Sequence, residues 1–284
     1  MLLASCEQVM FIDISDNDPK LVINGIVSHG SGMWVNVTES VGATKPEITS
    51  FVPVEDATVR VFHGDALVAT ITENNTGNYF SSEFVPLQGE SYDIEVEAEG
   101  LPVAGSFIEI PGLVEITGYD TSTLVRPGFF NNQGASKEVD FFLDLSIDDP
   151  EEPGNYYMLG AYLQENEQRY PLNLDTEDLD MNVYISDGMG ILACNDENFN
   201  GKEKVFQVRS RLAGPEGFQA LITISLYSIE KEYFDYLKSY SQNFTVLNSD
   251  MILFEPVLVS TNIDHGYGII AAVSESSVQF KYVF

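Results

Sequence analysis

Basic residues are scarce in this chain. Its 284 residues include 13 Lys and Arg against 44 Asp and Glu, which gives a formal net charge of -31. Such an excess of negative charge repels phosphate backbones, so we expect no nucleic-acid partner. The excess suits a partner with basic loops or a cation ligand, while the plainer interpretation is a solvated extracellular surface.

Cysteines and long apolar runs are also rare. The two cysteines, Cys6 and Cys194, exclude the disulfide framework of small secreted domains, and Cys194 lacks the CxxC spacing of a redox or zinc site. No segment reaches the ~18 consecutive apolar residues of a membrane helix. A hydrophobic content of 44% nevertheless predicts a buried core, and the length allows two domains.

Catalytic motifs are missing as well. The sequence contains no GxSxG, no HExxH and no phosphate loop, and His29, His63 and His265 form no catalytic pattern. Carboxylates are too numerous to single out an acid/base pair. We therefore predict no enzymatic activity and no catalytic residues, and keep a carbohydrate-active enzyme as the weaker alternative.

The first residues contain a candidate lipid-attachment motif. Leu3-Ala4-Ser5-Cys6 has the form of a bacterial lipobox, which predicts Cys6 as the acylated residue and residues 1–19 as a signal remnant and tether. A secretory signal carries a basic region and ~7–15 apolar residues before the cleavage site, and only Met1 to Ala4 precede Ser5. A start late in the precursor, a misassigned start codon and a chance match remain open.

Alternation of apolar and polar residues predicts half-buried strands along most of the chain. Tyr92, Ile94, Val96 and Ala98 alternate with four acidic residues, and the same period runs over 139–147, 220–226 and 278–284. Turn sequences such as His63-Gly64-Asp65 and Asn74-Asn75-Thr76-Gly77 separate such runs. Short strands at this spacing are typical of all-β architectures such as sandwiches.

One segment has a helical period. Ile229, Tyr233, Tyr236, Leu237 and Tyr240 form one stripe, which predicts a helix near residues 229–242. Ser228 is the expected N-cap, and Glu230 and Glu232 suit the positive end of the helix. The tyrosines either form a sugar or partner platform or, as we expect, pack on a sheet.

A boundary is predicted at Ile110-Pro111-Gly112. It divides the chain into a β-sandwich over 20–111 and a second β-rich, sandwich-like domain over 112–284, which contains the helix. The predicted fold class is therefore mainly β, with two domains.

One loop nearly matches a calcium-binding sequence. Asp196, Asn198 and Asn200 occupy ligand positions of an EF-hand loop, but the twelfth position is Gln207 in place of the bidentate glutamate. A turn that enters a strand is the favoured interpretation, with calcium as the alternative and no other cofactor. The acidic stretches 148–154 and 175–180 offer similar alternatives: a cation site or solvated turns.

Blocks spread over nearly the whole chain carry a family resemblance. They are Ser5-Cys6-Glu7, Phe11-Ile12-Asp13, Pro19 to Gly25, Val54 to Val59, Tyr92 to Gly100, Pro153 to Tyr157, Asp196 to Lys202, Tyr233 to Leu237, Glu255-Pro256-Val257 and Asn262 to Ile269. In this order and spacing the chain resembles Bacteroidota outer-membrane lipoproteins of a domain-of-unknown-function family, typically encoded beside TonB-dependent receptors. Members normally show a full signal peptide, from which this chain departs.

The resemblance implies several properties. They are an immunoglobulin-like or carboxypeptidase-regulatory-like sandwich as the first domain, no established enzymatic activity, and an outer-membrane location on the periplasmic or cell-surface face. We therefore expect a lipid-anchored binding protein that is an accessory to a TonB-dependent receptor in nutrient uptake. A surface adhesin or structural envelope module is the alternative.

Overall fold

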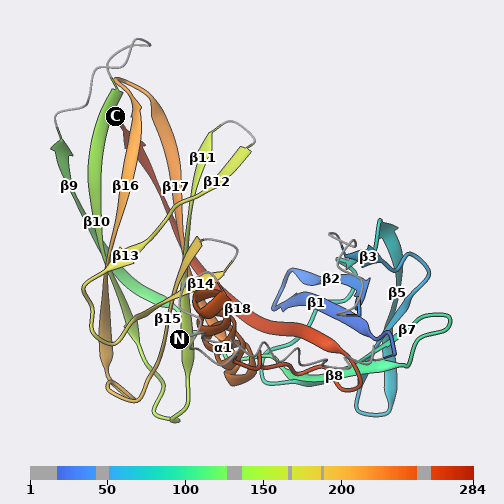
Figure 1. The fold of residues 1–284 in the computed structure, drawn as a ribbon. Coiled ribbons are helices and arrows are strands. Elements are labelled where there is room, and N and C mark those ends of the chain that lie inside the picture. Colours follow the sequence, from blue (N-terminus) through green and yellow to red (C-terminus); the bar gives the residue numbers. More distant parts are fainter. Residues whose placement is uncertain (1–17, 43–50, 127–135, 166–167, 187–188, 248–256) are drawn as a thin grey trace, which may run out of the picture.

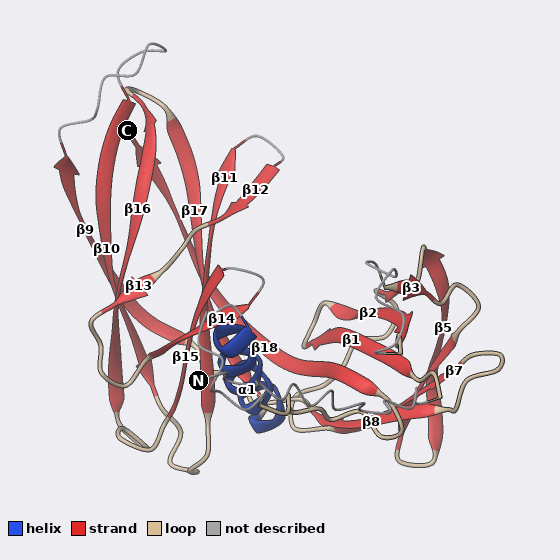
Figure 2. Ribbon diagram, in the orientation of Figure 1, coloured by secondary structure: helices blue, strands red, loops and turns tan. Residues whose placement is uncertain are grey.

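The computed structural model of the protein describes residues 18–42, 51–126, 136–165, 168–186, 189–247 and 257–284. In these ranges the chain is mainly β, with one helix, and its sandwich-like sheets form two lobes joined by a long strand (Figure 1). Strands dominate both lobes, and the helix lies between them (Figure 2). This confirms the predicted fold class. Cys6 and most of the predicted tether lie outside the described residues.

The first lobe is a sandwich of short antiparallel strands. Its strands are β1 (Leu21–Ser28), β2 (Gly32–Glu39), β3 (Val52–Pro53), β4 (Thr58–His63), β5 (Ala66–Asn75), β6 (Asn78–Ser81), β7 (Ser91–Glu97) and β8 (Ala104–Glu109). The predicted turns lie where expected, because Gly64 and the pair Thr76-Gly77 adopt the positive φ angles that tight hairpins need. β5 pairs with β6 at one end and β4 at the other, so it links the two layers.

The second lobe packs two sheets face to face. One sheet has the order β13-β16-β10-β9, from β13 (Asp175–Thr176), β16 (Glu203–Pro215), β10 (Ser136–Asp148) and β9 (Ile116–Arg126). The other contains β14 (Asn182–Ser186), β15 (Met189–Asn195), β11 (Tyr156–Glu165), β17 (Gln219–Ile229) and β18 (Tyr267–Val283), with β12 (Gln168–Pro171) on β11. Alternate residues of β10, from Val139 to Ile147, fill the core between the sheets.

β18 belongs to both lobes. Its first half pairs in parallel with β1, and its second half pairs antiparallel with β17, so one sheet continues from lobe to lobe (Figure 1). Ile270 and Ala272 pack in the first core, whereas Ala271 and Val273 face the helix. The first core therefore takes residues from the end of the chain as well as from the range predicted for it. The predicted domain limits remain predictions.

The helix α1 (Lys231–Leu247) packs on one face of the sheet that contains β14, β15, β17 and β18, through Phe234 and Leu237. The predicted cap is wrong: Ser228 is a buried residue inside β17, because that strand continues to Ile229. Glu230 precedes the helix instead, and its carbonyl accepts the Phe234 N–H at 3.1 Å. No helix in the described ranges is both long and apolar enough to span a membrane.

Candidate functional site

A groove of about 450 Å³ lies where the two lobes meet, and we call it the inter-lobe groove. Ile26 and Ser31 form its first-lobe wall. β11, β17 and α1 contribute Met158, Tyr227 and Tyr233 from the other side. Pockets of this size at a junction between domains, with mostly apolar walls, are the usual location of ligand sites.

The shared strand β18 brings these walls together. Ile26 lies opposite Ala271 of β18, and Val273, two residues further on, lies opposite Ile229 of β17. A glycine of β11, Gly160, also lines the groove. A Cβ atom at Gly160 would lie 3.1 Å from Cε2 of Tyr227, so the missing side chain lets the tyrosine ring lie close to the β11 backbone.

The inter-lobe groove is weakly charged in an otherwise acidic chain. Glu275 is its one charged lining residue among those described, and its carboxylate accepts a hydrogen bond from Ser225 Oγ at 2.6 Å. Burial raises the pKa of the Tyr227 hydroxyl and raises the pKa of Tyr233 to about 12. Both hydroxyls are therefore neutral at physiological pH and can donate or accept hydrogen bonds.

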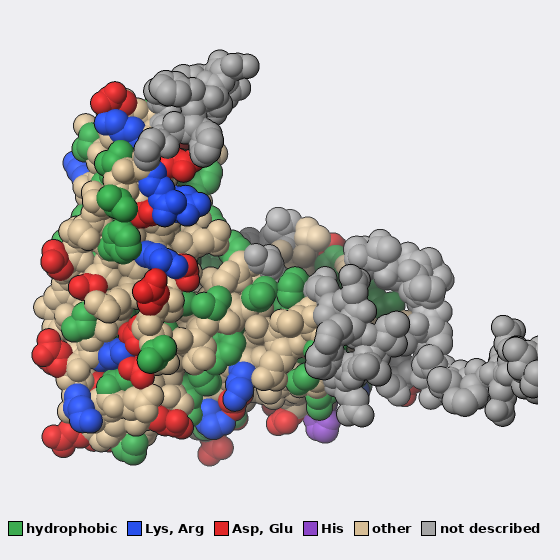
Figure 3. Space-filling view, turned by 60° about the vertical axis from the view of Figure 1, so that its left-hand side comes forward, with side chains coloured by type: hydrophobic (Ala, Val, Ile, Leu, Met, Phe, Trp, Pro, Cys, Tyr) green, Lys and Arg blue, Asp and Glu red, His purple; other side chains and the backbone are tan. Residues whose placement is uncertain are grey.

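A second hollow, of about 680 Å³, lies on the four-stranded sheet, and we call it the arginine groove. Arg126, Arg209 and Arg211 line it together with Asp140 and Asp175. The segment 171–173 borders both grooves. Figure 3 shows Lys and Arg side chains gathered on one face of this lobe, with Asp and Glu beside them.

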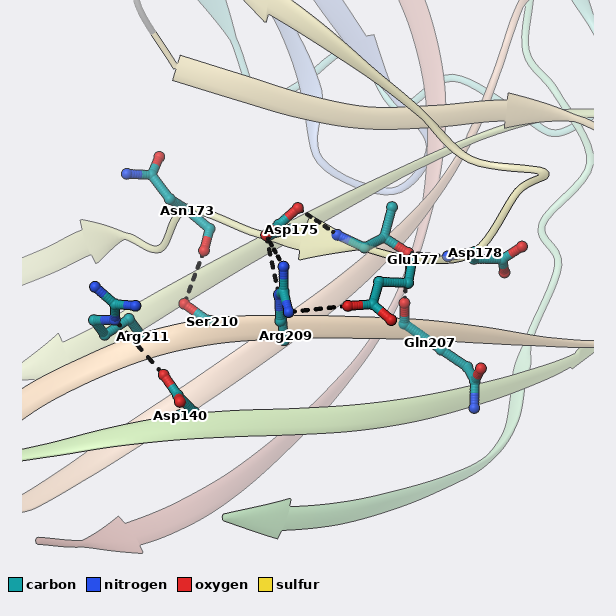
Figure 4. A network of polar contacts seen from close by, with 10 residues as sticks. Asp140, Asn173, Asp175, Glu177, Asp178, Gln207, Arg209, Ser210 and Arg211 are labelled. Atoms are coloured by element: carbon teal, nitrogen blue, oxygen red, sulfur yellow. Dashed lines mark hydrogen bonds and ion pairs between the residues drawn. The ribbon is translucent and has the colours of Figure 1, made fainter. Parts of the chain in front are cut away.

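The three arginines are held differently. Arg209 is fully engaged: its Nε and Nη2 bind Asp175 at 3.0 and 2.7 Å, and its Nη1 binds Glu177 at 3.2 Å (Figure 4). Arg126 and Arg211 both approach Asp140 through Nε, at 2.5 and 3.6 Å. Asp140 therefore positions two guanidinium groups at once.

The calcium candidates have separate partners in the structure. The Asp196 carboxylate, only 2% exposed, accepts backbone N–H groups of Gly154 and Asn155 at 2.9 and 3.0 Å. The Asn198 amide donates to Asp180 at 2.9 Å, and the Asn200 amide donates to the Glu151 carbonyl at 3.1 Å. Among the described residues no group of three His, Cys, Asp or Glu could hold a metal. Calcium stays a prediction.

The acidic stretch 175–180 binds cations that belong to the protein itself. Lys204 Nζ lies 2.9 Å from Asp178 and 2.5 Å from Asp180, and these carboxylates and the ammonium are largely buried. The ammonium also lies 5.3 Å from the centre of the Phe199 ring, a cation–π contact. The Lys204 ammonium lowers the pKa of Asp180.

Asp149, from the acidic loop 148–154, is used in a similar way. It is 7% exposed and accepts hydrogen bonds from the Tyr157 hydroxyl and from the Gly201 N–H. Burial raises the pKa of this carboxyl above its ordinary value. The loop is thereby tied to the turn at Gly201, which enters β16.

One further carboxylate joins the lobes. Glu230 Oε1 accepts the Glu109 N–H of β8 at 2.6 Å, and Oε2 accepts the Ala272 N–H of β18 at 3.0 Å. Burial raises the pKa of Glu230 to about 7. Glu230 therefore holds the start of α1, the edge of the first lobe and the shared strand in one arrangement.

The remaining residues singled out in the sequence are dispersed. His63 Nε2 lies 2.9 Å from Glu90 on the surface, and His29 Nδ1 lies 3.1 Å from the Pro86 carbonyl. Cys194 is a free, fully buried thiol, and burial raises its pKa. Neither groove was predicted from the sequence, although Arg209 and Arg211, two residues apart on one strand face, were a signal for the second.

Several solved structures resemble the chain weakly. AggA, the major subunit of aggregative adherence fimbriae type I from Escherichia coli, is 8% identical, with 58% of this chain and 93% of that one covered and a TM-score of 0.25. The enterotoxigenic E. coli adhesin CfaE is 8% identical, with 94% and 86% covered and a TM-score of 0.26. BcpA, the major pilin subunit of Bacillus cereus, is 10% identical, with 75% and 65% covered and a TM-score of 0.20. TM-scores this low carry no argument about function.

The sequence itself gives a clearer assignment. No match was found among curated proteins. A family model matches nearly the whole chain, and its description names no catalytic activity. Residues 7–279 match the family described as a domain of unknown function, DUF4249, and the chain therefore belongs to that family.

Proposed function

We propose that this chain is a lipid-anchored binding protein of the bacterial outer membrane, on its periplasmic or cell-surface face, and an accessory to a TonB-dependent receptor. In this proposal the inter-lobe groove holds a small ligand with a mostly apolar surface. The protein binds this ligand and does not catalyse its conversion.

The observation that carries the ligand-binding part of the proposal is the inter-lobe groove. Its volume of about 450 Å³ falls in the range of ~300–1,000 Å³ that is typical of ligand sites. Apolar walls with a few neutral hydroxyls, from Tyr227 and Tyr233, suit a ligand that buries apolar surface and makes one or two oriented hydrogen bonds. The net charge of -31 suits a receptor with basic loops, because complementary charge speeds encounter.

Affinity purification tests the receptor part of the proposal. A tagged full-length precursor is purified from detergent-solubilised native membranes, and the co-purifying proteins are identified by mass spectrometry. We expect a TonB-dependent receptor in near-stoichiometric amount. Recovery of the lipoprotein alone would contradict this and would favour a free-standing adhesin or structural envelope module.

The anchor is tested separately at Cys6. Two or three acyl chains give stable membrane retention, whereas one chain gives marginal binding. Cys6→Ser is therefore expected to move the full-length protein from the membrane fraction to the soluble fraction, with Cys194→Ser as the control that leaves the anchor intact. A Cys6→Ser protein that stays on the membrane would refute the anchor.

A further inference from the structure

The arginine groove contains a concentration of positive charge that is unexpected in this chain. Only five of the 284 residues are arginines, and three of them line this one hollow. Two of the three, Arg126 and Arg211, share the single carboxylate of Asp140. These three groups together carry one uncompensated positive charge, on a protein whose net charge is -31.

The way in which Asp140 holds the two arginines leaves their outer ends available. Both contacts use Nε, and among the described residues no hydrogen bond engages the Nη atoms of Arg126 or Arg211. The Asp140 side chain is 12% exposed, whereas those of Arg126 and Arg211 are 48% and 63% exposed. A buried carboxylate therefore fixes two guanidinium groups whose terminal donors face solvent, which is an arrangement suited to a carboxylate ligand.

The rest of the groove adds two other kinds of contact. Phe142 and Leu124 line it with apolar side chains that are 38% and 57% exposed. Asn173 and Asp175 bring an amide and a carboxylate, which accept hydrogen bonds from hydroxyl groups. A ligand that satisfies all of these groups carries a carboxylate, hydroxyls and an apolar face.

We propose that the arginine groove is a second binding site, distinct from the inter-lobe groove, for a short sugar-acid oligosaccharide with one carboxylate seated on Arg126 and Arg211. An acidic peptide such as triglutamate fits less well, because it lacks the hydroxyl groups that donate to Asp175 and Asn173. A long polyanion is disfavoured too. Its charges outside the groove lie more than a Debye length of about 8 Å from the arginines, so they gain little attraction, and they lie over the acidic surface instead.

Isothermal titration calorimetry on the full-length chain tests this site with trigalacturonate as the probe. Wild-type protein is expected to bind it, and Arg211→Gln to weaken binding by about tenfold or more, because a charge-assisted contact is lost. Arg60→Gln is the matched control: it removes the same charge from a strand-borne arginine of the first lobe, paired with Glu97 at 2.8 Å, and is expected to leave the affinity unchanged.

Two further probes define the chemistry. Maltotriose, a neutral sugar of the same length, and triglutamate, an acidic peptide, are both expected to bind at least about tenfold more weakly than trigalacturonate. The site is refuted if trigalacturonate does not bind, or if Arg211→Gln, which alters an exposed side chain, binds it as well as Arg60→Gln. Equal binding of maltotriose or triglutamate would overturn the sugar-acid assignment.

Discussion

The two lobes are built from the same kind of strand but place their charged groups differently. In the first lobe the ion pairs lie at the surface: Arg60 with Glu97, and His63 with Glu90, have side chains 35–52% exposed. In the second lobe Lys204 and its partner Asp178 are 12% and 9% exposed. Among the described residues the buried carboxylates, Asp140, Asp149 and Asp196, are all in the second lobe.

This difference indicates which lobe uses buried charged groups to fix the positions of other groups. A buried ion pair contributes little net stability, because desolvation offsets the attraction between the charges. Apolar residues of the same volume stabilise the folded state at least as well. The first lobe has such an apolar core. The second lobe keeps buried carboxylates where they fix arginines, loops and turns, and one of them, Asp140, lines the arginine groove. We infer that the first lobe is mainly a support and that recognition is concentrated in the second lobe and at the junction.

The largest expected effect comes from removing one cation from each lobe and comparing the two losses of stability. Lys204→Met leaves Asp178 and Asp180 without their partner in a largely buried position, and is expected to lower the free energy of unfolding by about 3–5 kcal/mol. Arg60→Met breaks an exposed pair and is expected to cost about 0–1 kcal/mol. Urea denaturation at pH 7 measures both values, and equal losses would contradict the difference between the lobes.

The pH dependence of the Lys204 effect gives a second check. The folded-state pKa of Asp180 lies below its ordinary value of 3.8, so the stability that it contributes is present above pH 3.8 and is lost as the pH falls through the folded pKa. The gap between wild type and Lys204→Met is therefore expected to narrow below about pH 4. A gap that stays constant down to pH 3 would contradict this explanation.

The junction between the lobes has its own expected pH response. The folded-state pKa of Glu230 is raised from 4.5 to about 7, so its contribution to stability is fully present below pH 4.5 and is lost as the pH rises through 7. Relative to Glu230→Gln, the free energy of unfolding of the wild type is expected to fall by up to about 3 kcal/mol between pH 4.5 and 8. Denaturation at several pH values measures this, with Glu232→Gln, an exposed neighbour, as the control.

The contrary result for Glu230 is a pair of parallel profiles. If wild type and Glu230→Gln change equally with pH, the carboxylate does not titrate in this range, and the hydrogen bonds from Glu109 and Ala272 outweigh its burial. If the stability difference between wild type and Glu232→Gln changes with pH as much as the difference between wild type and Glu230→Gln, the effect belongs to general surface charge.

Two fully buried tyrosines give the smallest expected contrast. Tyr157 donates to the Asp149 carboxylate, and Tyr79 donates to the Val54 carbonyl at 2.7 Å and accepts the Ala57 N–H at 2.9 Å. Tyr157→Phe and Tyr79→Phe are each expected to cost about 1–3 kcal/mol at pH 7. Only the cost of Tyr157→Phe is expected to shrink on acidification, because Asp149 then becomes neutral. Equal pH dependence of the two variants would contradict the role of the carboxylate.

The strands were predictable because alternation and turn chemistry are local signals. The runs 92–98, 139–147, 220–226 and 278–284 all contribute to strands, and Gly64 and Gly77 lie in the turns expected of them. The helix was predictable from its stripe, but its start was not. Ser228 has the chemistry of a cap, yet strand pairing with Ser274 of β18 holds it in β17.

The pairing of β18 with both lobes could not be predicted from local sequence patterns. Residues 269–274 are buried on both faces, against the first core on one side and against α1 on the other, so they show no alternation. Their parallel pairing with β1 joins segments more than two hundred residues apart. The inter-lobe groove escapes prediction for the same reason, since Ile26, Met158 and Tyr227 meet only through that pairing.

Native mass spectrometry of the full-length protein, purified gently from its own membranes, tests the central claim that the inter-lobe groove holds a ligand. The informative variants are Ile26→Gln, in the groove wall, and Leu67→Gln on β5, whose side chains are 44% and 54% exposed. We expect a bound small molecule on wild type and on Leu67→Gln, and most of it lost from Ile26→Gln. A protein that carries no bound molecule, or an Ile26→Gln variant that retains as much as Leu67→Gln, would contradict the claim.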